Sequence, residues 1–382
     1  MQAAVLDGPG RPFDVREVEL DEPNAGEVLV RIAASGLCGS DLKALDGLRA
    51  IASFPVILGH EAAGVVEEVG EGVERLRPGD HVVLSILSAC GSCADCRRGR
   101  PNYCSTTAGA QPAGNLLDGS SRLTMNGRRL NHFLTVSSFA EYAVVPASAA
   151  TVIDPAMPLD RAALIGCAVL TGYGAVHNSA RVQAGSSVAV FGCGGVGLSA
   201  VQGARLAGAE TIVAVDVHPA KLALASSLGA TETVDARCGD PSGAVREATG
   251  GGADYAFEAA GRPDTIEQAW NSLAVGGLLT VIGTLPSGAK LTLAADPLIE
   301  EKRIAGCYLG SASPEGDVPA LVERYLDGEL QLDELVSRRI GLADLDDGFA
   351  RLREGTEARQ VVVFDGAAKL SIATQREETH VS

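Results

Sequence analysis

The stretch that decides the fold reads Ser187-Val-Ala-Val-Phe191, then Gly192-Cys-Gly-Gly-Val-Gly197, then the Ala-rich segment 198–207, and finally Thr211-Ile-Val-Ala-Val215-Asp216. The two apolar runs rich in β-branched residues are typical of buried parallel strands, and the segment between them predicts a helix. Glycines at the first, third and sixth positions of the loop match the requirements of a dinucleotide site. The first permits a tight turn, the second a close approach of a pyrophosphate, and the third close helix–strand packing.

The acidic residue at the end of the second strand completes this pattern. Asp216 lies about 20 residues beyond the glycines, where a carboxylate accepts both ribose hydroxyls and repels a 2′-phosphate. A glycine loop in another kind of βαβ unit is the alternative, but strand, helix, second strand and terminal carboxylate occur here together. The stretch predicts an NAD site that includes Gly192, Gly194, Gly195, Val196, Gly197 and Asp216.

The length and composition of the chain limit its domain number, its binding partners and its location in the cell. A length of 382 residues suggests two domains or one large one. A net charge of −17 argues against nucleic acid and anionic membrane as partners. The N-terminus does not resemble a secretory signal, and we expect no apolar run near the roughly 18 residues of a membrane span. Nine cysteines in such a chain indicate reduced thiols and metal ligands, so we expect a cytoplasmic protein.

The first 150 residues contain short apolar runs separated by Gly, Pro and Asp clusters. Strands are predicted at 3–6, 27–33, 64–69 and 81–84. Strands at this spacing without long helices between them favour a mostly antiparallel, barrel-like domain.

Three residues on separate segments form a candidate catalytic metal site. Cys38 lies in Gly36-Leu-Cys-Gly-Ser-Asp41, His60 in Gly59-His-Glu-Ala-Ala-Gly64, and Cys167 follows Gly166. Each alone is more often a buried structural residue. Together they would bind zinc through two thiolates and one imidazole, which leaves the fourth tetrahedral position open to water or substrate.

A second cysteine group has the spacing C-x2-C-x2-C-x7-C and consists of Cys90, Cys93, Cys96 and Cys104. A closed set of four thiolates has no open position, so it predicts a structural zinc that holds a lobe together. A redox-active CxxC is the competing interpretation, and the fourth cysteine favours zinc.

These motifs resemble the zinc-dependent medium-chain alcohol dehydrogenases, over the chain to about Phe364. The resemblance rests on 59–64, 90–104, Asp118-Gly-Ser-Ser-Arg-Leu-Thr124, Ser138-Phe-Ala-Glu-Tyr142, 166–174, 192–197 and Asp216. It implies an α/β protein with a mostly-β GroES-like catalytic domain at 1–168, which carries the zinc lobe at about 90–104. A Rossmann domain with a doubly wound parallel sheet would occupy 169–308, residues 309–364 would return to the catalytic domain, and 365–382 would form a flexible tail.

The resemblance also implies roles for individual residues. Cys38, His60 and Cys167 would hold the catalytic zinc, with Asp41 orienting the imidazole and Glu61 behind the metal. Ser40 would take the proton of the alcohol onward. The cofactor would contact Thr171 and Val196 at the nicotinamide, Lys221 near the adenosine ribose, Arg359 at the pyrophosphate, and Gly283 and Thr284 at the end of a strand.

Some positions depart from the family pattern. Lys43 stands where many relatives carry a histidine that ends the proton relay, and a charged lysine is a poorer relay at neutral pH. Ile86 and Leu309 replace common aromatics and predict more room beside the zinc, whereas Phe133 and Leu134 are expected to line the pocket. Ala108 matches a position that is basic in relatives that handle the glutathione adduct of formaldehyde, which argues against that substrate.

The predicted function is reversible, zinc- and NAD-dependent oxidation of a primary or secondary alcohol to an aldehyde or ketone, in a homodimer or homotetramer. A reductase of C=C or C=N bonds and an S-(hydroxymethyl)glutathione dehydrogenase are the enzymatic alternatives. A non-enzymatic nucleotide-binding scaffold is disfavoured, because the zinc ligands and the glycine fingerprint are intact.

Overall fold

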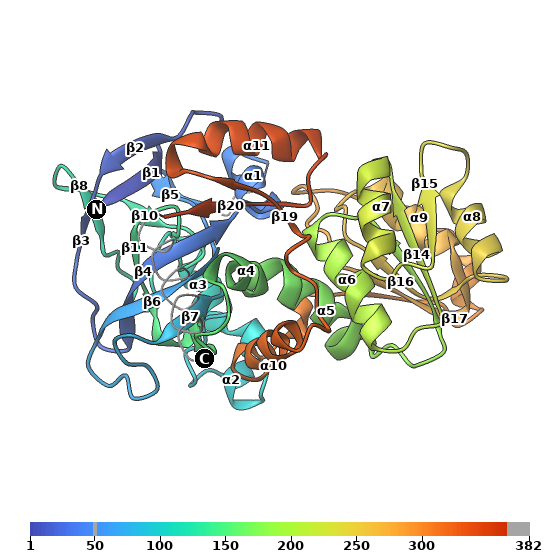
Figure 1. Ribbon diagram of the computed structural model, residues 1–382, viewed down its shortest axis with the longest axis horizontal. Helices are drawn as coiled ribbons and strands as arrows, with labels where there is room; N and C mark the ends of the chain where they lie inside the picture. The colour runs from blue at the N-terminus through green and yellow to red at the C-terminus, as the bar shows by residue number, and fades with distance from the viewer. Residues whose placement is uncertain (49–51, 365–382) are drawn as a thin grey trace, which may run out of the picture.

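The computed structural model describes residues 1–48 and 52–364, so the tail predicted at 365–382 lies outside the described residues. Figure 1 shows two bodies side by side, a β-rich one that contains both ends of the described chain and an α/β one built from its middle. The family's α/β architecture is therefore observed, with the mostly-β half and the parallel-sheet half as predicted.

The larger sheet of the β-rich body has the order β12-β7-β6-β4-β20-β19, and β11 also pairs with β4. Its pairs are antiparallel except β19 with β20, as expected for a mostly antiparallel domain. The strands are β4 (Glu27–Gly36), β6 (Glu61–Val69), β7 (His81–Leu84), β11 (Tyr142–Pro146), β12 (Ala150–Val152), β19 (Val336–Ile340) and β20 (Arg359–Val363). Val361 pairs with Gly36, so the C-terminal strand brings Arg359 to the segment that leads into Cys38.

Two smaller sheets complete this body. One contains β1 (Gln2–Leu6), β2 (Asp14–Glu17), β5 (Val56–Ile57) and β10 (Asn131–His132); the other contains β3 (Glu19–Leu20), β8 (Leu123–Met125) and β9 (Arg128–Arg129). Its helices are α1 (Gly39–Leu45), α2 (Ala94–Arg97), α3 (Ser105–Ala110), α10 (Pro314–Leu326) and α11 (Leu345–Glu354). Helix α10 begins at Pro314, which fits a first turn because its missing N–H is not needed there.

The α/β body has a six-stranded parallel sheet with the order β15-β14-β13-β16-β17-β18. Its strands are β13 (Ser187–Phe191), β14 (Thr211–Asp216), β15 (Glu232–Asp235), β16 (Ala253–Glu258), β17 (Leu273–Val281) and β18 (Arg303–Gly306). Helices α6 (Gly195–Leu206), α7 (Pro219–Ser227), α8 (Pro241–Ala248) and α9 (Pro263–Asn271) connect and cover them. The strand order reverses between β13 and β16, and ligands of such sheets bind in the crevice at that point.

Two predicted boundaries in this body differ from the structure. The helix after the glycine loop begins at Gly195 rather than 198, because the loop glycines form its first turn. Strand β17 ends at Val281, so Gly283 and Thr284 follow the strand instead of ending it. Strand β18 ends at Gly306, and the chain then turns through Leu309–Ser311.

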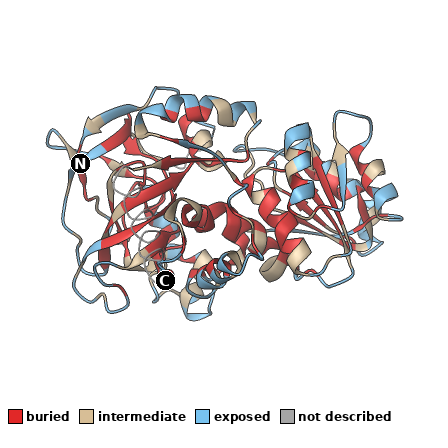
Figure 2. Cartoon of the chain, viewed as in Figure 1, coloured by how far each residue is buried: buried red, intermediate tan, exposed pale blue. Residues whose placement is uncertain are grey.

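A continuous helix, Leu159–Ala180, joins the two bodies. It consists of α4 (Leu159–Leu164), a π-helical segment Ile165–Val169, α5 (Leu170–Gly174) and a second π-helical segment Ala175–Ala180. No apolar run of this length was expected, yet at 22 residues with a mean hydropathy of 1.3 it could by length and composition cross a membrane. Because 78% of that apolar window is buried inside the molecule, we describe it as a core helix (Figure 2).

Candidate active site

The three candidate ligands of a catalytic metal meet at the junction of the two bodies. Cys38 is the N-cap of α1, His60 immediately precedes β6, and Cys167 lies in the first π-helical segment. Their ligand atoms all lie within 4.8 Å of one another, and all three residues are buried. Two thiols and an imidazole at this separation suit the tetrahedral N/S coordination of zinc. The π-helical segment is a local distortion that is frequent at functional sites.

Asp41 fixes the geometry around His60. It is fully buried, and its carboxylate accepts the Cys38 N–H at 3.2 Å, the Gly59 N–H at 3.0 Å and a hydrogen bond from His60 Nδ1 at 3.1 Å. Because Nδ1 faces a carboxylate, it carries the proton and Nε2 is the atom left for a metal. Asp41 therefore orients both the thiol segment and the imidazole.

The charges in this cluster support ligation. A hydrogen bond with Cys167, aided by His60, holds the pKa of the Cys38 thiol well below its usual range although burial opposes this. Burial opposes the charged form of His60, but the neighbouring Asp41 carboxylate raises the pKa of the imidazole well above its usual range. The Cys38 thiolate supplies the negative charge that a metal ion would neutralise, and a bound ion would take the place of the proton on Nε2 of the imidazole.

Glu61 and Arg359 form a buried pair behind these ligands. Arg359 Nε lies 3.7 Å from Glu61 Oε1, and neither carboxylate oxygen has a hydrogen-bond partner among the described residues. Burial raises the pKa of Glu61 to about 7, and Arg359 opposes the shift. Arg359 also donates to the Leu37 carbonyl at 3.2 Å, and a Cβ on Gly195 would overlap its guanidinium. Arg359 thus lies between the candidate metal site and the N-terminus of α6.

The glycine loop has the geometry of a phosphate cradle. Gly192 has φ +94°, and a Cβ there would lie 2.8 Å from the Ala260 nitrogen. A Cβ on Gly197 would overlap the Gly192 carbonyl, which explains the close packing of helix and strand. Nothing lies within 4 Å of a Cβ built on Gly194, the N-cap of α6, so the space over this helix N-terminus is open. A pyrophosphate fits this arrangement of free N–H groups and helix dipole.

The residues expected to contact the adenosine and nicotinamide parts of the cofactor lie next to this cradle. Asp216 ends β14 and accepts the N–H groups of Cys193 at 2.7 Å and His218 at 2.9 Å. Lys221 in the first turn of α7 lines the cavity, and burial lowers its pKa against the opposing effect of Asp216. Thr171 is buried, and its hydroxyl has no partner among the described residues, so it can bind a polar ligand group. These residues fit NAD.

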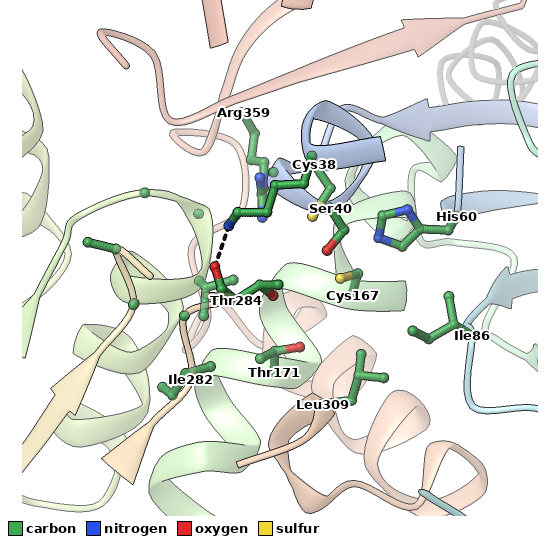
Figure 3. Close-up of a pocket in the computed structure, with 18 of the residues that line it drawn as sticks. Cys38, Ser40, His60, Ile86, Cys167, Thr171, Ile282, Thr284, Leu309 and Arg359 are labelled. Carbon is green, nitrogen blue, oxygen red and sulfur yellow. Dashed lines mark hydrogen bonds between the residues drawn. The ribbon is translucent and has the colours of Figure 1, made fainter. Parts of the chain in front are cut away.

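One cavity of about 460 Å³ connects the candidate metal site to the glycine loop (Figure 3). The Ser40 hydroxyl points into it toward the three ligands, and Ile86 and Leu309 form apolar walls. Lys43 also lines it and donates to the Thr284 carbonyl at 2.5 Å, marked by the dashed line in Figure 3. Among the other predicted site residues, the lining includes Thr171, Gly194, Gly195, Val196, Lys221, Gly283, Thr284 and Arg359.

One predicted lining residue lies elsewhere. Leu134 lines the cavity, but Phe133 is fully buried and packs edge-on against the His60 ring, with 5.7 Å between ring centroids. Phe133 therefore supports a ligand and is not among the lining residues. The Phe133 ring is taken up by its contact with the imidazole and by the core, which leaves Leu134 at the cavity.

The sequence prediction missed three polar lining residues, Tyr308, Glu357 and Gln111, the last of which lies at the C-terminus of α3. The only available signal for Gln111 was its spacing of three from Ala108, which places both residues on one face of a helix. Ala108 occupies a recognisable position of the family pattern, whereas a single glutamine belongs to no motif.

The four cysteines of the lobe also gather, with sulfur atoms within 4.8 Å of one another. Backbone N–H groups within the lobe donate to three of the sulfurs, at 3.3 Å to Cys90, 3.5 Å to Cys93 and 3.4 Å to Cys104. Hydrogen bonds from Thr106 and Ser92 lower the pKa of Cys90 to about 5. This donor set fits a closed structural zinc site.

Comparisons with known proteins agree with this geometry. Residues 24–155 match the family model of the alcohol dehydrogenase GroES-like domain, and residues 195–327 match that of the zinc-binding dehydrogenases. A Synechocystis protein named S-(hydroxymethyl)glutathione dehydrogenase is 38% identical over 95% of this chain and 99% of its own length.

Two solved structures share the whole fold. An alcohol dehydrogenase zinc-binding domain protein from Burkholderia ambifaria superposes with a TM-score of 0.91 at 39% identity, over 95% of this chain and 98% of that one. Benzyl alcohol dehydrogenase from Acinetobacter calcoaceticus gives 0.90 at 33% identity, over 95% and 99% of the two chains. With both halves matched and the two cysteine-containing clusters in place, the chain belongs to the zinc-dependent medium-chain alcohol dehydrogenase family.

Proposed function

We propose that this protein catalyses the reversible, NAD-linked oxidation of a primary or secondary alcohol to an aldehyde or ketone. The observation that carries the proposal is the single cavity that joins Cys38, His60 and Cys167 to the glycine loop. An alcohol carbon at the metal site and the nicotinamide of a cofactor whose pyrophosphate lies on the glycine loop would then share one cavity.

The bound groups would supply the chemistry that side chains lack: zinc acts as a Lewis acid, and NAD accepts a hydride. The chain's own residues bind, orient and move a proton. Ser40 presents its hydroxyl beside the ligands and would accept the proton of the alcohol. Ile86 and Leu309 exclude water, and Asp216 would hold the adenosine ribose hydroxyls.

Lys43 would not continue the relay as a histidine does. Its ammonium group is directed at the Thr284 carbonyl, so the proton would leave through water or a cofactor hydroxyl. The role we propose for Lys43 is to hold the two bodies together at the cavity.

A panel of alcohols tests the activity. The zinc-loaded protein should reduce NAD with primary, benzylic or secondary alcohols, and should reduce the matching aldehydes or ketones with NADH. A panel without turnover, combined with NADH-dependent reduction of an activated C=C or C=N bond, would favour the reductase alternative.

The glutathione adduct of formaldehyde remains the second candidate substrate, because a relative of 38% identity is named for it. Against it, the position expected to be basic is Ala108, and this residue lines the cavity. A higher kcat/KM for S-(hydroxymethyl)glutathione than for every simple alcohol would identify the glutathione adduct as the substrate.

The assembly we propose is a homo-oligomer formed through the edge of the parallel sheet. Strand β18 pairs with β17 on one side, and all four of its residues are exposed. Ile299 and Val275 nearby are 89% and 74% exposed, and such an apolar edge is readily paired with a second copy. Light scattering should give a dimer or tetramer, and Ile304→Lys on β18 should shift it toward monomer.

We also propose the domain boundaries 1–168, 169–308 and 309–364 and a cytoplasmic location. The return of β19 and β20 to the first sheet supports the boundaries. None of the nine cysteines, all of which lie in the described part of the chain, forms a disulfide, which supports a reducing compartment. Limited proteolysis tests the domain boundaries, and cell fractionation tests the cytoplasmic location.

A further inference from the structure

A second cavity adjoins the one that holds the candidate metal site. It measures about 270 Å³ and lies under the loop of the cysteine lobe, against the segment Pro101–Tyr103. The two cavities have four lining residues in common, Ile86, Ala108, Gln111 and Tyr308. The two spaces therefore meet at these four residues, which are the described side chains that an elongated molecule bound at the metal site would reach next.

Gln111 is the polar group at this boundary. It is 6% exposed, and its amide nitrogen donates to the Ile86 carbonyl at 2.9 Å and to the Leu134 carbonyl at 3.4 Å. Both N–H groups are therefore directed at the backbone, which fixes which way the amide faces. In the described part of the chain no group donates to its Oε1 atom. Because Gln111 lines both cavities, this oxygen is the acceptor that a ligand O–H or N–H would meet there. A ligand that displaced water from it without donating a hydrogen bond would leave the oxygen unpaired.

Among the described residues, the lining of the second cavity includes no Lys, Arg, Asp or Glu, and its one cysteine, Cys104, belongs to the four-cysteine cluster. Its walls are apolar or neutral polar side chains: Ile86, Leu87, Ser88, Pro101, Asn102, Tyr103, Cys104, Thr107, Ala108, Gln111 and Tyr308. The nearby Arg100 guanidinium lies over the Tyr103 ring at 5.4 Å and is paired with Asp95. A substrate carboxylate placed here would lose its hydration without gaining a counter-charge.

The cations of the first cavity lie on its cofactor side. Lys43 is bonded to Thr284, Lys221 lies on α7 near Asp216, and Arg359 lies against Gly195. They would meet the charged groups of NAD and are not placed to neutralise a distant part of the substrate.

We propose that the substrate is a neutral, elongated alcohol with a hydrogen-bond donor at its far end, which binds Gln111 Oε1. Its hydroxyl-bearing carbon occupies the three-ligand site, its body passes Ile86 and Ala108, and further groups enter the second cavity. Aryl alcohols with a ring hydroxyl are the simplest members of this class. The inference rests on the proposed alcohol dehydrogenase activity.

Matched substrate pairs test it. The comparison is kcat/KM for 4-hydroxybenzyl against 4-methylbenzyl alcohol, and for 2-(4-hydroxyphenyl)ethanol against 2-(4-methylphenyl)ethanol, with benzyl alcohol as reference. The members of each pair differ in donor ability and little in size. In at least one pair the hydroxyl member should be favoured about tenfold, since only it satisfies Gln111. Gln111→Met keeps the length but removes the acceptor, and should bring that ratio to about one.

A second pair of variants covers the case in which Gln111→Met fails to fold. Ala108→Leu narrows the boundary between the cavities and should lower kcat/KM for the phenylethanols at least fivefold relative to benzyl alcohol. Ala113→Leu makes the same change at an exposed position outside both cavities and should leave that ratio as in the wild type.

The experiment distinguishes failure of this inference from failure of the proposed function. If the wild type oxidises benzyl alcohol but gives the same hydroxyl-to-methyl ratio as Gln111→Met, this inference is wrong and the proposed function stands. A preference for S-(hydroxymethyl)glutathione over every neutral alcohol would also overturn it. If no alcohol is oxidised, both proposals fail.

Discussion

The Nζ atom of Lys43 donates a 2.5 Å hydrogen bond to the backbone carbonyl of Thr284. Lys43 belongs to α1 of the β-rich body, whereas Thr284 follows β17 of the α/β body, so the bond crosses the cavity between them. An ammonium–carbonyl bond that is partly shielded from water joins the two walls where the cofactor would lie.

Lys43→Met should therefore weaken NADH binding about threefold to tenfold, because it removes a charge-assisted hydrogen bond and keeps the aliphatic stem. Fluorescence titration of the zinc-loaded protein measures the dissociation constant. Lys290→Met, an exposed lysine outside the cavities, is the matched control. Equal NADH affinities for the two variants would show that the bond does not hold the cavity closed.

Asp216→Gly should relax the choice between cofactors. The carboxylate that would repel a 2′-phosphate is removed, so the ratio of kcat/KM with NAD to that with NADP should fall by about two orders of magnitude. Asp235→Gly makes the same change at the residue that pairs with Asp216 on the neighbouring strand β15, and should leave the ratio unchanged. If discrimination is unaltered in Asp216→Gly, the ribose contact lies elsewhere.

Asp41→Asn should lower the affinity of the catalytic site for zinc by about tenfold to a hundredfold. The carboxylate accepts three hydrogen bonds, and an amide would present N–H groups to at least one of these donors. Competition with a chelator of known affinity measures the change. Asp46→Asn on the same helix, where the carboxylate pairs with Arg353 at the surface, is the control. If Asp41→Asn retains zinc as well as Asp46→Asn does, Asp41 does not help to hold the catalytic zinc.

Cys96→Ser should act on the fold of the lobe more than on the chemistry. Loss of one thiolate opens the four-cysteine site, so we expect one zinc fewer per chain, a lower Tm and less soluble protein. The protein that remains folded should keep most of its specific activity. Cys238→Ser, at an exposed cysteine outside both clusters, should change none of these quantities. Normal Tm with lost activity would contradict a structural role.

The sequence predicted those parts of the site that rest on local patterns. Gly192 has a positive φ, Gly197 packs closely on the Gly192 carbonyl, and Gly194 leaves the space over the helix N-terminus open, so the spacing of these glycines carries the information. The ligands Cys38, His60 and Cys167 were identified because zinc chemistry restricts the residue types.

Contacts between distant segments were not predictable in the same way. The bond from Lys43 to Thr284 spans 241 residues and depends on how the two bodies pack. The position of Phe133 behind His60 and the role of Gln111 at a shared cavity wall depend on side-chain directions that no periodicity encodes. The apolar helix Leu159–Ala180 was missed because its π-helical segments and flanking charges obscure a regular pattern.

The most direct test of the central claim is the zinc content per chain of the wild type and of Cys167→Ser, with NADH formation from benzyl alcohol followed on the same samples. The account predicts two zinc ions and NAD-linked turnover for the wild type. It predicts one zinc ion and no turnover for Cys167→Ser, with unchanged far-UV circular dichroism. Two zinc ions in Cys167→Ser, or turnover equal to that of the wild type, would contradict a catalytic zinc at Cys38, His60 and Cys167.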